Sequence, residues 1–272
     1  MKNDKVPCAS ARGGTAERRW AILQEVQRNY HVSVAKLSQH FSVSRATIRR
    51  DLTHLEKMGL LQRVHGGAQA LSLAEQNLLF DARLLQRTAV KCSIGQTAAA
   101  LIRPGDIILL DSGTTVLEIA RRIPPALLEE GGLTVITRSL VIASELRSRR
   151  HIRLILLGGV YVHSFDTIVG SQVENALQGM HVDVLFIGTD GVTADFGLTT
   201  DNLMEAGLYP IMASRADRVV VVTDSSKIGV RQLQAILSLN EIHTFVTDSD
   251  APDDFVNMLE EKGIEVLLAP KP

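Results

Sequence analysis

The feature that most constrains this chain is a pair of short amphipathic helical patterns within residues 32–68. Val34, Leu37 and Phe41 recur at the spacing that places apolar side chains on one face of a helix. Ser42 and Val43 then interrupt this pattern before the next helical pattern begins. The pattern therefore predicts a short helix that ends in a sharp turn.

A second helix is predicted to begin at Ser44, whose hydroxyl can accept a hydrogen bond from a free amide of the first turn. Ile48, Leu52 and Leu55 recur at four- and three-residue spacing, so they face the core. Gly59 is suited to end the helix. Two helices in this order indicate a helix-turn-helix.

The outer face of the second helix is basic, and its polar residues gather near the N-terminal end, where a recognition helix meets base edges and phosphates. Residues 60–64 alternate like a strand, residues 65–67 can turn, and residues 68–71 can return as its partner, which completes a wing. The candidate DNA contacts are Ser44, Arg45, Thr47, Arg49, Arg50, His54, Lys57, Arg63 and His65.

An ordinary helical hairpin with solvated arginines is the alternative interpretation, because single surface arginines are common. The distribution of charge favours DNA binding. Residues 1–70 hold 12 Lys and Arg against 5 Asp and Glu, a surplus of 7 positive charges, and the remainder holds 17 against 25. The net charge of −1 therefore hides a basic N-terminal part joined to an acidic body, as expected when only one end approaches a polyanion.

The chain has 272 residues, of which 45% are hydrophobic, so we expect two domains. We predict a flexible tail over residues 1–14, a winged helix-turn-helix over 15–71, a linker or connecting helix over 72–87 and a second domain over 88–272. No segment resembles a signal peptide or a membrane span, which indicates a cytoplasmic protein. Cys8 and Cys92 are too few and too distant to suggest a metal cluster, and we expect neither a metal nor a cofactor.

From Thr88 the chain alternates between helix-length segments and apolar runs. A helix is predicted over residues 88–102, and this alternation is typical of an α/β fold with a mainly parallel sheet and helices on both faces. The predicted strands are residues 106–110, 133–136, 153–157, 182–187, 218–222, 244–246 and 265–268.

Ligands of such folds bind beyond the carboxyl ends of the strands, so the loops there hold the candidate site. The segment Asp111-Ser112-Gly113-Thr114-Thr115 offers hydroxyls, a glycine and free helix amides, which suit a phosphate. Simple helix capping by Ser or Thr is the alternative for this segment alone. The other candidate loop residues are Thr137, Arg138, Ser139, Gly158, Gly159, Asp190, Gly191 and Lys227.

Three of these loops have competing interpretations. Arg138 and Lys227 could neutralise an anionic ligand, although a lone lysine is more often a solvated surface group. Gly158 and Gly159 could be ordinary turn residues.

Several of these motifs resemble those of the DeoR family of bacterial transcriptional regulators, over almost the whole chain. The N-terminal match is VSVAKLSQHFSVSRATIRRDLTHLEKMGLLQRVHGGA, with its Arg-Arg-Asp run at residues 49–51. The C-terminal matches are DSGTT, LLGG, IGTDG, FGLTTDNLMEA and TDSSK. The resemblance implies a homo-oligomeric repressor of a sugar-catabolic operon, whose sensor domain binds a phosphorylated sugar and then releases operator DNA.

The second domain also resembles ribose-5-phosphate isomerase and coenzyme A transferases, which raises an enzyme as the alternative. The resemblance places Asp190 at the first acidic position of the isomerase site and Glu205 at its base. The isomerase's second aspartate would fall at Thr193. Its catalytic lysine has no counterpart in the FGLTTDN segment, where Thr199 and Thr200 stand instead. Without groups that stabilise an enediolate, binding without turnover is expected. We therefore expect a regulator with no catalytic residue.

One position departs from the regulator family, in which an asparagine usually follows the threonine where this chain has Arg138. Two interpretations are open. In the first, the effector differs, for instance by being more anionic, or the loop is rearranged. In the second, Arg138 is turned to solvent.

Overall fold

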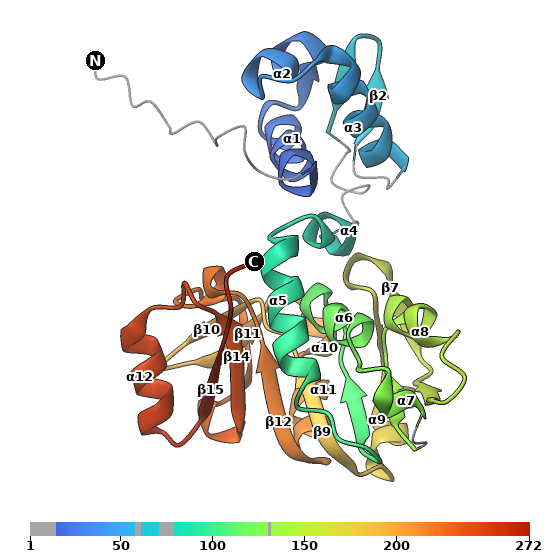
Figure 1. The fold of residues 1–272 in the computed structure, drawn as a ribbon, viewed down its shortest axis with the longest axis vertical. Helices are drawn as coiled ribbons and strands as arrows, with labels where there is room; N and C mark the ends of the chain where they lie inside the picture. The colour runs from blue at the N-terminus through green and yellow to red at the C-terminus, as the bar shows by residue number, and fades with distance from the viewer. Residues whose placement is uncertain (1–14, 58–60, 71–78, 130–131) are drawn as a thin grey trace. The chain divides into compact units, whose positions relative to one another are not determined.

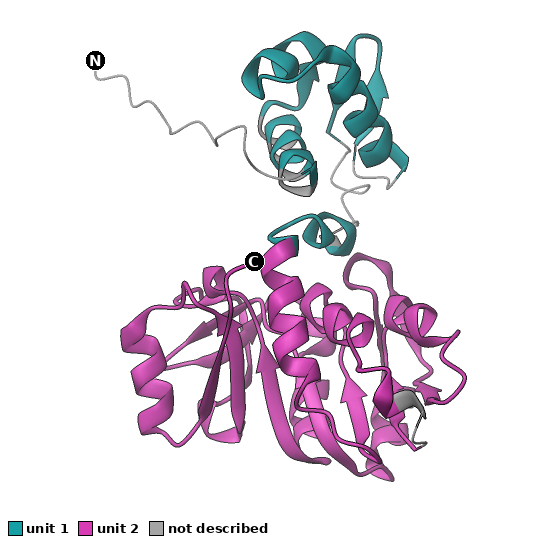
Figure 2. Cartoon of the chain, viewed as in Figure 1, with its two compact units in different colours: residues 1–88 teal, residues 89–272 magenta. Residues whose placement is uncertain are grey.

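The computed structural model describes residues 15–57, 61–70, 79–129 and 132–272, which fall into two compact units, residues 1–88 and 89–272 (Figure 2). Three expectations lie outside the described residues: the tail of residues 1–14, the helix stop at Gly59 and residues 72–78 of the linker. The two units are described separately below.

Unit 1 is a bundle of short helices with a small antiparallel sheet of strand order β1-β3-β2 (Figure 1). The two predicted helices and the predicted wing strands are present. Helix α1 precedes them, and strand β1 was not predicted, because three residues carry no readable periodicity. The elements are α1 (Thr15–Asn29), β1 (His31–Ser33), α2 (Val34–His40), α3 (Arg45–Lys57), β2 (Gln62–Val64), β3 (Gly67–Gln69) and α4 (Leu79–Leu84).

The core of unit 1 is formed where α1 and α2 pack on α3. Ile48, Leu52 and Leu55 are fully buried, as their spacing predicted. The sheet needs glycine at Gly67, because a Cβ there would lie 2.3 Å from the Val32 carbonyl oxygen. The wing is therefore fixed closely against strand β1.

Helix α4 lies within the segment expected to be a linker or a connecting helix. Ala82 and Leu85 are buried in the same core cluster as the side chains of α1 to α3. Residues 79–85 therefore pack as part of unit 1, which agrees with the helix interpretation for this stretch.

Unit 2 is built on a seven-stranded parallel sheet of order β15-β14-β12-β9-β4-β5-β6. Each predicted strand is present, with ends shifted by one or two residues. The helix predicted over residues 88–102 ends earlier, at Ala99. The strands are β4 (Ile107–Leu110), β5 (Thr134–Thr137), β6 (Arg153–Leu156), β9 (Val182–Ile187), β12 (Ala216–Val222), β14 (Thr244–Asp248) and β15 (Glu265–Ala269).

Helices cover both faces of this sheet, as the alternation predicted. Leu185 and Val221 point into a cluster that includes side chains of α9, α11 and α12. Their neighbours Phe186 and Val220 are also fully buried and point to the other face, where Figure 1 shows α5 and α6. The helices are α5 (Thr88–Ala99), α6 (Thr114–Arg121), α7 (Ala126–Glu129), α8 (Leu140–Leu146), α9 (Ser171–Gln178), α10 (Leu203–Ala206), α11 (Leu208–Ala213) and α12 (Asp253–Glu261).

Two small antiparallel additions to unit 2 were not predicted. One is a hairpin, and the other is a three-stranded sheet of order β10-β11-β13. Their strands are three or four residues long, which is too short for a recognisable alternation in the sequence. The strands are β7 (Val160–Val162), β8 (Thr167–Val169), β10 (Gly191–Thr193), β11 (Gly197–Thr200) and β13 (Gln234–Leu237).

The register of the large sheet places the candidate loops along one edge. Leu110 pairs with Thr137 and with Phe186, and Ile187 pairs with Val221. The loops that follow β4, β5, β9 and β12 therefore emerge side by side at the carboxyl ends of their strands.

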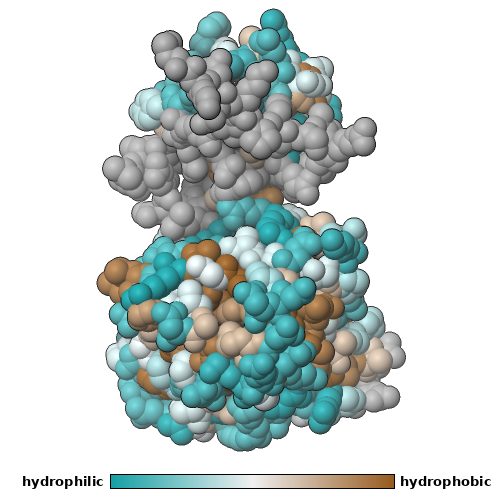
Figure 3. Space-filling model, turned by 90° about the vertical axis from the view of Figure 1, so that its left-hand side faces the viewer, coloured by the Kyte–Doolittle hydropathy of each residue, from teal (hydrophilic) through white to brown (hydrophobic). Residues whose placement is uncertain are grey.

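The surface of unit 2 is mixed in character. On the face that Figure 3 shows, apolar side chains stand among polar ones. The exposed apolar residues include Leu203, Met204 and Leu233. Within the described parts of the chain, no helix has the length and apolar content that a membrane crossing requires.

Candidate functional site

The first candidate site is the outer face of α3 in unit 1. Arg45, Arg49 and Arg50 are exposed, and none of them makes an ion pair with another described residue. Ser44 accepts a hydrogen bond from the Thr47 amide at 3.1 Å, as predicted, and its hydroxyl also pairs with that of Thr47 at 2.9 Å. The cap holds the start of the helix while the guanidinium groups stay free for an anionic partner.

A buried carboxylate fixes the opposite side of α3. Asp51 is 1% exposed and accepts hydrogen bonds from Nε of Arg18 at 2.8 Å and Nε of Arg19 at 2.9 Å. This pairing explains the acidic residue in the Arg-Arg-Asp run of residues 49–51. Arg49 and Arg50 face outward, whereas Asp51 ties α3 to α1. The orientation of the basic face is thereby set by the core of unit 1.

Three other residues that were predicted to contact DNA differ in exposure and in their own hydrogen bonds. Desolvation and nearby Arg19 lower the pKa of half-buried His54 below its ordinary 6.5, which disfavours its charged form. His65 is exposed in the wing turn. Arg63 is also exposed, and its Nη1 donates to the Thr53 hydroxyl at 3.0 Å.

The second candidate site lies at the carboxyl ends of the strands in unit 2 and begins with the N-terminus of α6. The N-cap is Gly113, at φ 127°, and no side chain caps this helix. The capping interpretation of the DSGTT segment is therefore wrong. The hydroxyls of Ser112, Thr114 and Thr115 have no hydrogen-bond partner among the described residues. Uncapped amides and free hydroxyls at a helix N-terminus are groups that can donate hydrogen bonds to an anion.

Beside this helix lies a buried charge cluster around Arg138. The side chain is 0% exposed, so the interpretation that it turns to solvent is wrong. Nε donates to Oδ1 of Asp111 at 2.5 Å, Nη2 donates to Oε2 of Glu205 at 3.0 Å, and Nη1 donates to the Thr167 hydroxyl. The guanidinium also lies 5.5 Å from the centre of the Tyr209 ring. Arg138 therefore joins four segments that are distant in the sequence.

The electrostatics of this cluster follow from its burial. Burial alone would lower the pKa of Arg138, but Asp111 and Glu205 raise it, so the guanidinium stays charged. Burial raises the pKa of Glu205 above its ordinary value, although Arg138 opposes the shift. Oδ2 of Asp111 is buried and has no hydrogen-bond partner. The cluster thus holds one arginine, two carboxylates and one unused acceptor.

Two predicted site residues serve the backbone instead. Ser139 caps α8 by accepting the Ile142 amide at 3.0 Å, and its hydroxyl donates to the Asp166 carboxylate. The Thr137 hydroxyl accepts the Ser139 amide at 3.1 Å. Both side chains are fully buried, so their hydroxyls shape the loop that presents Arg138.

The acidic loop after β9 lies near the cluster, since Asp190 contributes to the pKa of Glu205. Its Oδ2 accepts a hydrogen bond from the Thr200 hydroxyl at 3.0 Å. Gly191 is required by packing, because a Cβ there would lie 2.3 Å from the Val230 carbonyl oxygen. Thr200 therefore orients the Asp190 carboxylate.

The remaining predicted residues are not joined to the cluster by a contact. Lys227 ends the 3-10 helix η2 (Ser225–Lys227) after β12, is half-buried and forms no ion pair within the described chain. Gly158 and Gly159 are exposed at the start of the β7–β8 hairpin. A Cβ at Gly159 would lie 2.6 Å from the Val169 carbonyl oxygen, which supports their interpretation as turn residues.

Sequence reasoning missed several residues of the site: Asp166, Thr167, Asn202 and Tyr209. Asn202 caps α10 by accepting the Met204 amide at 3.1 Å, and its buried Nδ2 has no partner. It lies inside the FGLTTDNLMEA motif, so that motif contained a signal. Asp166 and Thr167 belong to an irregular hairpin and have no such signal.

Comparison with known proteins identifies both units. The model of the DeoR-like helix-turn-helix domain matches residues 18–73, and the model of the DeoR C-terminal sensor domain matches residues 86–249. A putative aga operon transcriptional repressor from Escherichia coli O157:H7 is 35% identical, over 94% of both chains. The repressor GlcR from Bacillus subtilis is 31% identical, over 93% of this chain and 95% of the relative.

Two solved structures are more distantly similar. Ribose 5-phosphate isomerase A from Methanocaldococcus jannaschii is 21% identical, with a TM-score of 0.37 over 51% of this chain and 53% of that chain. The delta subunit of initiation factor eIF-2B from A. fulgidus is 15% identical, with a TM-score of 0.44 over 92% and 87%.

The prediction of a regulator and not an enzyme agrees with these relatives, which are named as transcriptional repressors. With a matching DNA-binding model, a matching sensor model and relatives that span nearly its whole length, this chain belongs to the DeoR family of transcriptional regulators.

Proposed function

We propose that this chain represses a carbohydrate-catabolic operon and that a phosphorylated sugar relieves the repression. The observation that carries the proposal is the uncapped N-terminus of α6 beside the buried Arg138 cluster. The helix amides and the hydroxyls of Ser112, Thr114 and Thr115 suit the phosphate. The unused Oδ2 of Asp111 can accept a hydrogen bond from a sugar hydroxyl.

The charge of Arg138 bears on which sugars fit. Asp111 and Glu205 already neutralise the guanidinium, so it has no free charge to offer a second anionic group. With Asp190 nearby, the sugar end of the site has more negative than positive groups. This balance favours an effector with hydroxyls, and not a carboxylate, at its sugar end. It therefore disfavours the interpretation that Arg138 signals a more anionic effector.

The enzyme alternative is disfavoured by the same contacts. Glu205 stands where the isomerase resemblance places the base, but its carboxylate is held by Arg138 at 3.0 Å. A general base needs a carboxylate that is free to take a proton from the substrate. A site that binds a sugar phosphate and returns it unchanged serves a sensor.

On DNA, the exposed face of α3 is proposed to read the major groove. In a homo-oligomer, a dimer would place two such helices about 34 Å apart, on a repeated operator. Sugar phosphate binding would favour an arrangement of the sensor domains in which this spacing no longer matches. Such a shift requires different ligand affinities in the two arrangements.

The test is fluorescence anisotropy on duplex DNA from upstream of the gene cluster, against a scrambled duplex at fixed physiological salt. We expect selective binding that a phosphorylated sugar weakens. Arg49→Ala should abolish operator binding while ligand-induced stabilisation persists, and exposed Arg150 in unit 2 offers the matched control Arg150→Ala. Equal, weak binding to both duplexes would overturn the proposal, and so would full operator affinity of the Arg49→Ala variant.

A further inference from the structure

A cavity of about 490 Å³ lies at the edge of the sheet opposite the candidate sensor site. Arg218 is near the start of β12, Thr244 begins β14 and Glu265 begins β15. Arg103 lies in the turn between α5 and β4. Because the strands are parallel, these residues surround their amino ends, whereas the sensor site lies at the carboxyl ends. A ligand of this cavity would therefore be separate from the effector.

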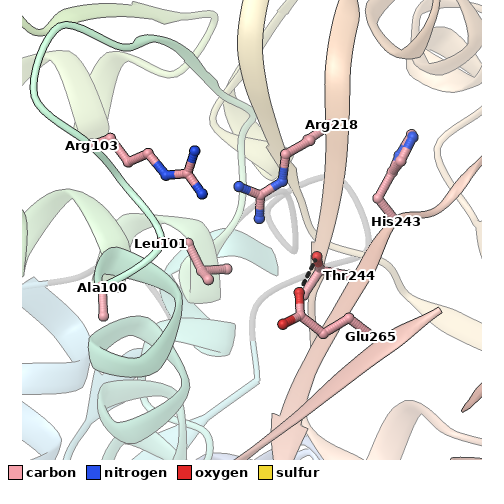
Figure 4. A pocket seen from close by; sticks show the side chains of 7 residues that line it. All are labelled: Ala100, Leu101, Arg103, Arg218, His243, Thr244 and Glu265. Carbon is pink, nitrogen blue, oxygen red and sulfur yellow. Dashed lines mark hydrogen bonds between the residues drawn. The ribbon is translucent and has the colours of Figure 1, made fainter.

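The cavity contains two arginines that make no ion pair with another described residue. Figure 4 shows the guanidinium groups of Arg103 and Arg218 pointing toward one another across it. Neither group makes a side-chain hydrogen bond or an ion pair with another described residue. Asp217, next to Arg218 in the chain, alternates to the other face of the strand and pairs with His181 at 3.2 Å. Two facing cations repel one another, and an anion held between them would remove the repulsion.

The rest of the lining suits a hydroxylated carbon skeleton. Glu265 is the acidic residue of the lining, and its Oε2 accepts a hydrogen bond from the Thr244 hydroxyl at 3.1 Å (Figure 4). This leaves Oε1 of Glu265 available to a ligand hydroxyl. The Leu101 side chain supplies an apolar wall. A few polar groups beside an apolar wall, in a volume within the usual range, are typical of small-molecule sites.

We propose that this cavity is a second ligand site, which binds a small hydroxylated phosphate monoester with its phosphate between Arg103 and Arg218. Guanidinium groups suit this role because each can donate two parallel hydrogen bonds to a phosphate. The proposal is independent of the effector site, since no residue is shared between the two.

The test is isothermal titration of the full-length protein with glycerol 2-phosphate, and separately with inorganic phosphate, at constant ionic strength. We expect Arg218→Gln and Arg103→Gln each to weaken phosphate monoester binding about tenfold, because each removes charge-assisted hydrogen bonds to the phosphate. The exposed Arg150 provides the control Arg150→Gln, which should leave the affinity unchanged. Unliganded melting curves establish that every variant is folded.

A second variant separates the two sites. Lys227→Gln alters the proposed effector site at the other edge of the sheet, so binding in the cavity should survive it. Binding that is lost in Lys227→Gln but unchanged in Arg103→Gln and Arg218→Gln would overturn the proposal. No detectable binding of either probe to the wild-type protein would also overturn it.

Discussion

Replacing Arg138 with Met should destabilise unit 2 strongly, because it leaves two buried carboxylates without their partner. Asp111 is 0% exposed, and Glu205 is 4% exposed. Breaking a buried ion pair by removing one member costs about 3 to 5 kcal/mol. For a unit of this size, such a loss lowers the melting temperature by roughly 6 to 20 °C.

The loss should also depend on pH, in a direction that the cluster dictates. Burial already raises the pKa of Glu205, and Arg138 is the group that opposes this shift. In Arg138→Met the folded-state pKa rises further above the unfolded value, so the folded variant binds more protons than the unfolded chain. Its stability therefore falls as pH rises from the unfolded pKa through the folded one. The difference between wild type and variant should be smaller at pH 5 than at pH 8.

The chain allows the two units to be followed separately. Its single tryptophan, Trp20, belongs to unit 1, so tryptophan fluorescence reports that unit, whereas circular dichroism reports both. Arg138→Met should shift the circular dichroism transition and leave the fluorescence transition in place. Adding Glu205→Gln should restore part of the loss, because it removes one uncompensated charge.

The matched control is Arg121→Met. Arg121 pairs with buried Glu118 at 2.7 Å, but the Arg121 side chain is 41% exposed, and Arg122 also pairs with Glu118. Arg121→Met therefore leaves no buried charge without a partner, and it should cost about 1 kcal/mol or less. A loss in Arg138→Met as small as that of the control would refute the reasoning. A large loss that is the same at pH 5 and pH 8 would show that lost packing, not uncompensated charge, is responsible.

Three further predictions concern both units. Asp51→Asn should lower the stability of unit 1 by about 1 to 3 kcal/mol, measured by Trp20 fluorescence, because it weakens two charge-assisted hydrogen bonds; an unchanged midpoint would contradict this. Arg45→Ala should weaken binding to operator and scrambled DNA alike and reduce the slope of log affinity against log salt by about 1, whereas an unchanged slope would remove Arg45 from the phosphate contacts. Gly95→Ala should destabilise unit 2 by about 1 to 3 kcal/mol, because its Cβ would lie 2.6 Å from Cβ of Glu118, whereas Gly158→Ala, with open space around it, should be neutral in the same melting experiment.

Much of the fold could be predicted because the strands of a parallel sheet are buried on both faces. Val182–Ile187 and Ala216–Val222 are nearly continuous apolar runs, and such runs can be recognised without knowledge of their neighbours. The strands of the β10-β11-β13 sheet contain residues such as Gly197 and Thr199, whose burial depends on packing with other segments. Local pattern has no information about that packing.

The two candidate sites differ in predictability for a related reason. The face of α3 is contained in one helix, so its spacing in the sequence fixes which side chains lie together. The sensor site is assembled from the ends of several strands. Arg138 meets Asp111 from 27 residues away and Glu205 from 67 residues away. The sequence predicted that the loops lie along one edge of the sheet, but it did not predict these pairings. It therefore left open whether Arg138 faces solvent.

The pairing of Arg138 with Glu205 also bears on the proposed sensor role of unit 2. The Glu205 carboxylate is held in an ion pair, and its other neighbours, Asp111 and Asp190, are acidic. Freeing Glu205 to act as a base would require breaking a buried pair, at a cost similar to that of removing Arg138. In the proposed site, Arg138 would therefore leave no free base beside a bound sugar, so the binding energy would remain available to shift the proposed equilibrium between sensor arrangements.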